Sequence, residues 1–471
     1  MKKYKVIDGN EACSYVSYMF TEVAGIYPIT PASPMSEYID VWSNNGRKNI
    51  FNSEVKLVEM QSEAGAIALC HGALQTGTIA STYTSSQGLL LMIPSMYKIA
   101  GEMLPCVINV ASRTVATHAL SIFGDHSDIY ATRSSGFSYL ASSSVQDVPY
   151  MTLISYLSTL KGRIPFVNFF DGFRTSHELN KIELFDMTDI KGLIPKKEID
   201  EFRKSSMLYS KKIRGTAQND DVYFQNIEAR NKYYEEMPDI VNDYMKKVND
   251  KFKTDYKPFN YYGSKNATKV IVAMGSVCSS IKELIDILIE NGEEVGLIEV
   301  HLFRPFSKKY FIDVLPKTVR KIAVLDRAKE AGAPGEVLYT DVVNILNDVK
   351  NKPLVVGGRY GLSSKDTNLE DLYAVYKNLD SKNPINSFTI GITDDITNKS
   401  LKKAKLKNTK KNIEMLIYGY GSDGMISASK DIVKQIGETT EGFTQGYFQY
   451  DSKKSGVCIR RISAGASEPR C

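Results

Sequence analysis

Three prolines fall within seven positions of the stretch Tyr27–Met35, at Pro28, Pro31 and Pro34. Each proline removes a backbone N–H donor and restricts the residue before it, so this stretch cannot form a helix. An apolar run leads into it and a helix-compatible run leaves it, which predicts a short buried strand, a stiff loop and then a helix. In open α/β sheets ligands bind beyond the carboxyl ends of strands, so the hydroxyl of Thr30 is expected at the mouth of a site. A proline-stiffened surface turn is the alternative interpretation.

Helical and strand-like patterns alternate through the first third of the chain. Helices are expected from the turn Asp8–Asn10, which leads into an N-cap, to about Ala24, and over residues 36–44 and 59–74. The last of these is rich in small residues, which allow close packing against a neighbour or a ligand. Further elements follow in order: an edge strand at 51–57, strands at 79–84, 107–111 and 165–170, and helices at 89–100 and 145–159. This alternation predicts an α/β fold with a parallel sheet.

Two charged residues stand where they can serve a site. Glu63 comes just before the run of small apolar residues, and a carboxylate at a dry interface has a raised pKa unless it is partnered, which suits proton transfer. The alternative is an exposed first-turn acid that complements the helix dipole. Arg113 stands just past the strand 107–111, where a guanidinium can bind a carboxylate bidentately. A surface ion pair is the alternative for this arginine.

Metal and nucleic acid sites are not indicated. The segment Phe123–Asp128 has a metal-like composition but no further ligand cluster nearby, which favours a glycine-bearing loop that shapes the cleft. The six cysteines form no CxxC pair and the five histidines no HxxxH frame, so no zinc site is expected. The 59 basic and 54 acidic residues are spread along the chain, which is too weak a charge pattern to indicate nucleic acid.

Single cysteines inside apolar segments are typical of reduced, buried thiols. The basic N-terminus lacks the apolar segment of a signal peptide, and no apolar run is long enough for a membrane span. We therefore expect a cytoplasmic protein that does not cross a membrane. A chain of 471 residues should hold about three domains.

Composition divides the chain further. Between about residues 182 and 258 it shifts to Lys, Glu, Asp, Asn and Tyr, which predicts a charged helical linker or clamp. A second α/β unit follows, with strands expected near 270–276, 294–302 and 322–327; it lacks GxGxxG, which argues against NAD.

A third unit starts near residue 412, with a strand that runs into a glycine-rich turn. Backbone N–H groups of such a turn, at a helix N-terminus, can bind an anion; the turn residues are Gly421, Ser422, Asp423, Gly424 and Met425. One more strand is expected at 445–450, followed by Lys453. A lone βα unit cannot bury both faces of a strand, so this domain looks cut off.

Several long blocks closely resemble the N-terminal part of the pyruvate:ferredoxin (flavodoxin) oxidoreductases, which are thiamine-diphosphate and iron–sulfur enzymes. They span about residues 5–456 in the order of the family. The blocks are YPITPASPM (27–35), QSEAGAIALCHG (61–72), SSQGLLLMIPSMYKIAGE (85–102), ALSIFGDHS (119–127), LDRAKEAGAPGE (325–336) and YFQYDSKKSG (447–456).

The resemblance implies a role for each of the residues singled out above. Thr30 matches the threonine that hydrogen-bonds pyruvate, Glu63 the glutamate on the aminopyrimidine of thiamine diphosphate, and Arg113 the arginine that holds the pyruvate carboxylate. In the family this glutamate drives the tautomerism that activates the cofactor, carbon dioxide leaves, and coenzyme A takes the acetyl group. The turn Gly421–Met425 and Lys453 resemble, more loosely, the coenzyme A phosphate site.

The implied organisation has five parts. They are a pyrimidine-type thiamine-diphosphate-binding domain with the pyruvate site (1–180), a charged helical linker (181–258), a transketolase C-terminal-like α/β domain (259–411), the start of a truncated coenzyme A-binding α/β domain (412–456) and an unrelated tail (457–471).

Family members are much longer than this chain. Their iron–sulfur clusters and the domain that holds the cofactor diphosphate and Mg²⁺ lie downstream, and no CxxCxxC run occurs here. From Val457 onward the sequence looks unlike the family, which predicts a truncated or frame-shifted product.

Two hypotheses follow. The chain is either the substrate-facing portion of an oxidoreductase for pyruvate or another 2-oxo acid, with ferredoxin or flavodoxin as acceptor, or an inactive remnant that binds a partner subunit. The family forms dimers, so a homodimer is expected of the full-length form.

Overall fold

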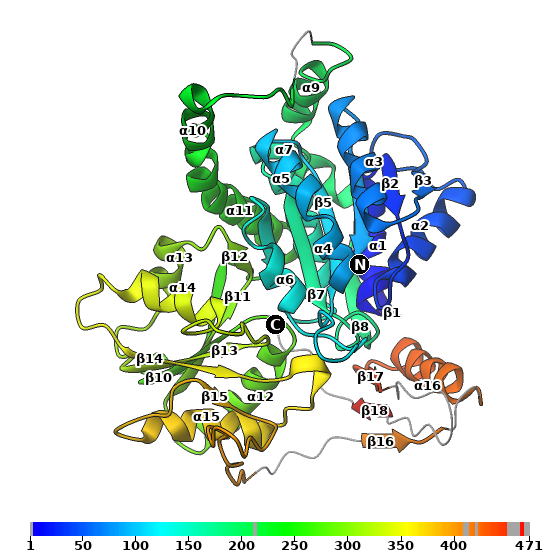
Figure 1. Ribbon diagram of the computed structural model, residues 1–471. Helices are drawn as coiled ribbons and strands as arrows, with labels where there is room; N and C mark the ends of the chain where they lie inside the picture. The colour runs from blue at the N-terminus through cyan, green and yellow to red at the C-terminus, as the bar shows by residue number, and fades with distance from the viewer. Residues whose placement is uncertain (1–2, 211–213, 408–413, 420–422, 450–461, 466–471) are drawn as a thin grey trace.

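The described residues of the chain form three β-sheets, two of which are built mainly from parallel strands (Figure 1). The computed structural model describes residues 3–210, 214–407, 414–419, 423–449 and 462–465. Within these ranges no helix combines the length and the apolar character needed to cross a membrane.

The seven-stranded sheet has the order β12–β6–β7–β5–β4–β2–β3. All neighbouring strands are parallel except β12, which pairs antiparallel with β6. Every residue of β5 and β7 is buried, as expected for central strands covered on both faces. The strands are β2 (Val23–Ile26), β3 (Lys56–Glu59), β4 (Ala80–Thr84), β5 (Val107–Ser112), β6 (Ser138–Ala141), β7 (Phe166–Asp171) and β12 (Leu302–Arg304). The predicted α/β class with a parallel sheet is confirmed.

Helices before, between and after these strands cover the sheet. They are α1 (Gly9–Phe20), α2 (Ser33–Asn44), α3 (Glu63–Gln75), α4 (Ser86–Leu91), α5 (Ile93–Gly101), α6 (Ser127–Thr132) and α7 (Asp147–Gly162). Helix α7 is buried along almost its whole length, because α1 packs on one side of it and the later helix α11 on another.

Several predicted helix boundaries are wrong. Helix α2 begins at Ser33 instead of residue 36, so the last residues of the proline-rich stretch are helical, because Pro34 fits the first turn of a helix, where its missing N–H is not needed. Helix α1 ends at Phe20 instead of Ala24, because Thr21 turns extended and the residues from Val23 pair with two strands. Helix α3 begins at Glu63 instead of residue 59, because the preceding residues continue the sheet as β3 and Ser62 caps the helix. The single helix expected at 89–100 is divided into α4 and α5 near Pro94, which has no N–H for a helical bond.

Helices fill most of the segment predicted as a charged linker. They are α8 (Met187–Ile190), the 3₁₀ turn η1 (Lys191–Leu193), α9 (Lys196–Lys204), α10 (Asp220–Glu228) and α11 (Asn231–Phe252). Helix α11 buries Met237, Val241, Met245 and Val248, which lie on one face and pack against α7. Helix α10 buries no residue and stands away from the sheets in Figure 1.

The six-stranded sheet has the order β15–β14–β13–β10–β11–β9, and only β9 runs antiparallel to its neighbour. Its strands are β9 (Phe259–Gly263), β10 (Lys269–Ala273), β11 (Val295–Val300), β13 (Lys321–Asp326), β14 (Leu354–Arg359) and β15 (Phe388–Thr389). Its helices are α12 (Val277–Glu290), α13 (Lys308–Val314), α14 (Val337–Leu346), the 3₁₀ turn η2 (Leu362–Ser364) and α15 (Leu369–Asp380). The unit is α/β as predicted, but its β12 joins the seven-stranded sheet.

The five-stranded sheet joins the start of the chain to its last described strands. Its order is β1–β8–β17–β18–β16, all antiparallel. The elements are β1 (Lys3–Ile7), β8 (Leu179–Leu184), β16 (Glu414–Ile417), α16 (Met425–Thr439), β17 (Gln445–Phe448) and β18 (Ile462–Gly465).

The expectation of a lone βα unit is therefore wrong. Strand β17 extends the sheet of β8 and β1, and Val433 of α16 packs against Val6, Leu179 and Phe448. Residues 462–465, which were expected to belong to an unrelated tail, form β18 between β16 and β17. The other residues of 457–471 lie outside the described ranges.

We predict opposite effects for two glycine-to-alanine changes around α3. A Cβ atom at Gly25 would lie 2.5 Å from the carbonyl oxygen of Ala66, whereas one at Gly72 would meet nothing within 4 Å. Gly25→Ala should therefore lower the free energy of unfolding by about 1–3 kcal/mol. Gly72→Ala should raise it by up to about 1 kcal/mol, since alanine is the better helix former. Urea unfolding measures both, and equal effects would contradict the close packing of α3 on β2.

Candidate functional site

Thr30, Glu63 and Arg113 all lie at the carboxyl edge of the seven-stranded sheet. Thr30 is in the loop after β2, Glu63 is the first residue of α3 after β3, and Arg113 directly follows β5. Because these strands are parallel, their carboxyl ends meet at one edge. The structure therefore brings the three predicted residues to the same side of one sheet.

The loop that carries Thr30 is held by backbone and side-chain bonds. The backbone N–H of Ala32 donates to the carbonyl of Ile29 at 2.8 Å, and the buried amide of Asn10 donates to the carbonyl of Pro31 at 3.0 Å. Thr30 itself is exposed, and its carbonyl accepts a bond from Nη1 of Arg113 at 2.9 Å. These bonds hold the loop at Ile29 and Pro31, and its threonine is exposed. The stiffness of the loop stays a prediction.

Arg113 is not a surface ion pair, because only 6% of its surface is exposed. Nε donates to the carbonyl of Ser121 at 3.1 Å and Nη1 to that of Thr30. Burial lowers the pKa of Arg113, and the nearby Asp128 opposes this shift. An arginine carries five N–H donors, so donors are left over for a carboxylate after these two bonds.

Glu63 is buried, with 5% of its surface exposed, so the exposed-acid interpretation is wrong. Within the part of the chain that the structure describes, no hydrogen bond or ion pair engages its carboxylate. A Cβ atom at Gly88 of α4 would lie 2.7 Å from Oε1 of Glu63 and 2.6 Å from Oγ1 of Thr84. The Thr84 hydroxyl is buried and also has no hydrogen-bond partner among the described residues. Two polar groups without protein partners therefore meet at a glycine that leaves them room.

The segment Phe123–Asp128 does not gather its acids and histidine around one point. Asp125 accepts bonds from Thr114 and Ser127, whereas Asp128 accepts backbone bonds on the other side of the loop. Burial raises the pKa of Asp128 to about 8, and its hydrogen bonds from backbone N–H groups oppose this rise. Nowhere in the described ranges do three or more His, Cys, Asp or Glu side chains form a group that could hold a metal ion.

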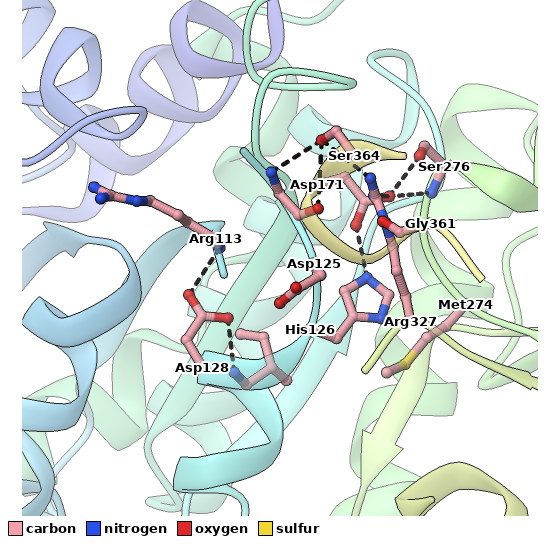
Figure 2. Close-up of polar contacts among 12 residues, drawn as sticks. Arg113, Asp125, His126, Asp128, Asp171, Met274, Ser276, Arg327, Gly361 and Ser364 are labelled. Carbon is pink, nitrogen blue, oxygen red and sulfur yellow. Dashed lines mark hydrogen bonds and ion pairs between the residues drawn. The ribbon is translucent and has the colours of Figure 1, made fainter. Parts of the chain in front are cut away.

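His126 instead takes part in a buried polar cluster between the two parallel sheets (Figure 2). Asp171, the last residue of β7, is fully buried and lies 2.6 Å from Nε2 of His126 and 2.6 Å from Nη1 of Arg327. The backbone N–H of Ser276 donates to the same carboxylate at 2.9 Å. Arg327 and Ser276 belong to the six-stranded unit, so this cluster fixes that unit to the first.

Charge explains why this cluster is stable although it is buried. Burial alone would raise the pKa of Asp171, but the charge of Arg327 and the contacts of His126 and Ser276 hold it well below its ordinary value. Arg327 in turn donates to the carbonyl of Gly361 at 3.0 Å and to Ser364 at 3.3 Å. The backbone N–H of Ser364 donates to the carbonyl of Gly124 at 2.8 Å, so the second unit also holds the loop after Arg113.

A second contact between the units involves Asp326 at the end of β13. Its carboxylate accepts bonds from the hydroxyl of Tyr130 at 2.6 Å and from the first backbone N–H groups of α14. Burial raises the pKa of Asp326 to about 7.

The residues proposed for coenzyme A are only partly described. Gly424 has a φ of 83° and precedes α16, and Oδ1 of Asp423 accepts a bond from the backbone N–H of Met425 at 3.0 Å. The predicted glycine turn at a helix start is therefore present over Asp423–Met425. Gly421, Ser422 and Lys453 lie outside the described residues.

Sequence reasoning missed Asp171, Arg327, Asp128 and Thr84. The sequence holds a usable signal for Asp171 and Arg327. Asp171 ends the apolar strand β7 and Arg327 directly follows the apolar strand β13, where charged residues can meet at a sheet edge. Their pairing joins residues 156 positions apart, and one sequence alone does not show it.

Two family models match this chain. "Pyruvate flavodoxin/ferredoxin oxidoreductase, thiamine diP-bdg" matches residues 15–246, and "Pyruvate:ferredoxin oxidoreductase core domain II" matches residues 267–372. These ranges contain the seven-stranded and most of the six-stranded sheet.

Curated relatives agree with these matches. A pyruvate-flavodoxin oxidoreductase of Klebsiella pneumoniae is 51% identical over 458 residues, which cover 96% of this chain and 39% of the relative. A pyruvate:ferredoxin oxidoreductase of Moorella thermoacetica is 51% identical over 465 residues, covering 98% and 40%. The chain belongs to the pyruvate flavodoxin/ferredoxin oxidoreductase family, and it spans about two fifths of the length of these relatives.

A solved structure shares the fold. The 2-oxoglutarate:ferredoxin oxidoreductase of Magnetococcus marinus superposes with a TM-score of 0.60 at 18% identity, covering 80% of this chain and 65% of that one.

We predict that Asp171→Asn destabilises the protein by about 3–5 kcal/mol near neutral pH, because it leaves Arg327 buried without its partner. The pKa of Asp171 is depressed in the folded state. Its contribution to the free energy of unfolding is therefore fully present above a pH of about 4 and is lost as the pH falls further. The stability gap between wild type and variant should thus stay constant from pH 8 to 5 and narrow below pH of about 4.

Urea unfolding at several pH values measures this gap. Asp366→Asn, which removes the exposed partner of Arg174, is the control and should cost less than about 1 kcal/mol. A gap of the same small size for both variants would contradict the role of Asp171.

Proposed function

We propose that this chain is the thiamine- and substrate-binding portion of a pyruvate:ferredoxin or pyruvate:flavodoxin oxidoreductase. Such an enzyme decarboxylates pyruvate oxidatively to acetyl-coenzyme A and carbon dioxide and passes electrons to ferredoxin or flavodoxin. The observation that carries the proposal is the buried, unpaired carboxylate of Glu63 at the sheet edge that also holds Arg113.

The residues around Glu63 fit thiamine diphosphate. An aminopyrimidine edge offers both donors and acceptors, and the unpaired Glu63 carboxylate and Thr84 hydroxyl beside Gly88 could pair with it. When bound, this cofactor supplies the carbon nucleophile for the 2-oxo group of the substrate. Glu63 would hold a proton between its carboxylate and a pyrimidine nitrogen, and its burial would keep water from competing for that bond.

Arg113 and Thr30 would bind the substrate. The free N–H donors of Arg113 suit the carboxylate of a 2-oxo acid, and the bonds of its guanidinium to the carbonyls of Thr30 and Ser121 fix its direction. The hydroxyl of Thr30, on a loop held at Pro31, would donate to an oxygen of the substrate. These two residues position pyruvate, and Glu63 acts on the cofactor.

Other parts of the reaction are assigned outside this chain. The sequence contains no CxxCxxC run, so the iron–sulfur clusters would be bound by further domains. The family resemblance implies the same for the Mg²⁺ and diphosphate site. We propose that the turn Gly421–Met425 and Lys453 contribute to coenzyme A binding and that the full protein is a homodimer. The buried free thiols of Cys13, Cys70, Cys106 and Cys278 support a cytoplasmic location.

We predict that the 471-residue chain alone does not reduce a viologen dye with pyruvate, thiamine diphosphate, Mg²⁺ and coenzyme A, because it has no cluster ligands. A chimera in which this chain replaces the matching region of the Klebsiella pneumoniae relative should be active. Robust turnover by the chain alone would contradict the assignment.

In that chimera Glu63→Gln should lower kcat by about 10²-fold or more, because an amide cannot hold the proton on the cofactor ring. Glu54→Gln removes an equal charge at the surface, where Glu54 pairs with Lys48, and should leave kcat unchanged. Dye reduction at saturating pyruvate measures both. Wild-type turnover in Glu63→Gln would refute the role of Glu63.

A further inference from the structure

The turn between β4 and α4 is bonded to the strand end that carries Arg113. The hydroxyl of Ser85 donates to the carbonyl of Ala111 at 2.7 Å, and the hydroxyl of Ser86 donates to the carbonyl of Thr114 at 2.6 Å. Ser86 has a φ of 50°, a left-handed conformation that costs a non-glycine residue free energy. The surrounding bonds therefore hold this turn in a conformation that it would not adopt by itself.

Asp128 on α6 lies between the same two segments. Its Oδ2 accepts the backbone N–H of Ser86 at 2.8 Å and that of Arg113 at 2.9 Å, and its Oδ1 accepts that of Ile129 at 2.8 Å. Asp128 is fully buried. Figure 2 shows its carboxylate under the backbone of Arg113, with the guanidinium directed away from it. Asp128 thus binds the main chain of Arg113, and the side chain of Arg113 extends toward the site.

These bonds complete a continuous path across the proposed site. The guanidinium of Arg113 contacts Thr30, and the N–H of Arg113 shares the Asp128 carboxylate with Ser86. Two residues beyond Ser86, Gly88 lies against the carboxylate of Glu63. A shift of the Asp128 carboxylate would therefore move the guanidinium of Arg113, proposed to bind the substrate, relative to the carboxylate of Glu63, proposed to bind the cofactor.

The support of Asp128 comes from the second unit. The N-cap of α6 is His126, whose backbone N–H donates to the carbonyl of Arg327 at 2.9 Å and whose ring contacts Asp171. Tyr130, on the same helix, bonds to Asp326. Helix α6 is therefore fixed at both contacts between the two sheets, and Asp128 projects from a rigid element.

We propose that Asp128 is a positioning residue that sets the spacing between Arg113 and the Gly88–Glu63 side of the site, and so governs substrate affinity. This inference rests on the proposed function for the roles of Glu63 and Arg113. A carboxyl group suits the place because its two oxygens accept three backbone N–H groups, Oδ2 those of Ser86 and Arg113 and Oδ1 that of Ile129. An asparagine keeps one acceptor oxygen, but its N–H₂ group would face at least one of these three backbone N–H groups.

The test is hydrogen–deuterium exchange of the 471-residue chain, with and without pyruvate, in wild type, Asp128→Ala, Asp128→Asn and Asp371→Asn. We expect amides in peptides covering residues 84–90 and 111–116 to exchange at least tenfold faster in Asp128→Ala, and by less in Asp128→Asn. Pyruvate should protect the peptide with Arg113 in wild type, and half-protection should need at least tenfold more pyruvate in Asp128→Ala. If the alanine variant does not fold, Asp128→Asn carries both measurements, with a threefold change expected.

Asp371→Asn is the matched control, because Asp371 is also buried and its carboxylate also accepts a backbone N–H group, that of Asn368 at the start of α15, away from α6. It should leave the exchange of both peptides and the pyruvate concentration at half-protection within twofold of wild type. The inference would be overturned by unchanged exchange in the Asp128 variants, by an equal change in Asp371→Asn, or by an unchanged pyruvate concentration at half-protection. Absence of pyruvate protection in wild type would instead refute the proposed substrate, and the exchange rates without pyruvate would still decide whether Asp128 holds both segments.

Discussion

The ion pair between Asp171 and Arg327 is the contact on which the arrangement of the two parallel sheets depends. A buried carboxylate is stable only when charges and donors compensate its lost hydration. Here Arg327, His126 and Ser276 supply that compensation from two separate units. Removal of either charge would leave the other one buried, so the two units are held together electrostatically as well as by packing.

This contact reaches the proposed site through the loop 113–127 and α6. Ser364 and Arg327 of the second unit bind the backbone of Gly124 and His126, and α6 then presents Asp128 to the turns that carry Arg113 and Ser86. The second unit thus contributes no side chain to the proposed substrate contacts, but it determines where those contacts lie.

Local patterns were enough to predict much of this structure. The prolines of Tyr27–Met35 predicted the loop after β2, and the strand–helix alternation predicted the parallel sheet with Thr30 and Arg113 past strand ends. Helix boundaries failed where sheet pairing outweighed helical periodicity, as at Val23 and at β3. The pairing of β17 with β8 and of Asp171 with Arg327 joins residues far apart in the chain, and no local pattern specifies such contacts. The chemical roles of Thr30, Glu63 and Arg113 came from the family resemblance and stay predictions.

The central claim is that Arg113, held by Asp128 behind it and by Thr30 beside it, binds the carboxylate of a 2-oxo acid next to Glu63. A crystal structure of this chain soaked with pyruvate tests that claim most directly. We predict pyruvate with its carboxylate on the guanidinium of Arg113 and within hydrogen-bond reach of the Thr30 hydroxyl. Pyruvate bound elsewhere, or an Arg113 without ligand at a saturating concentration, would contradict the claim.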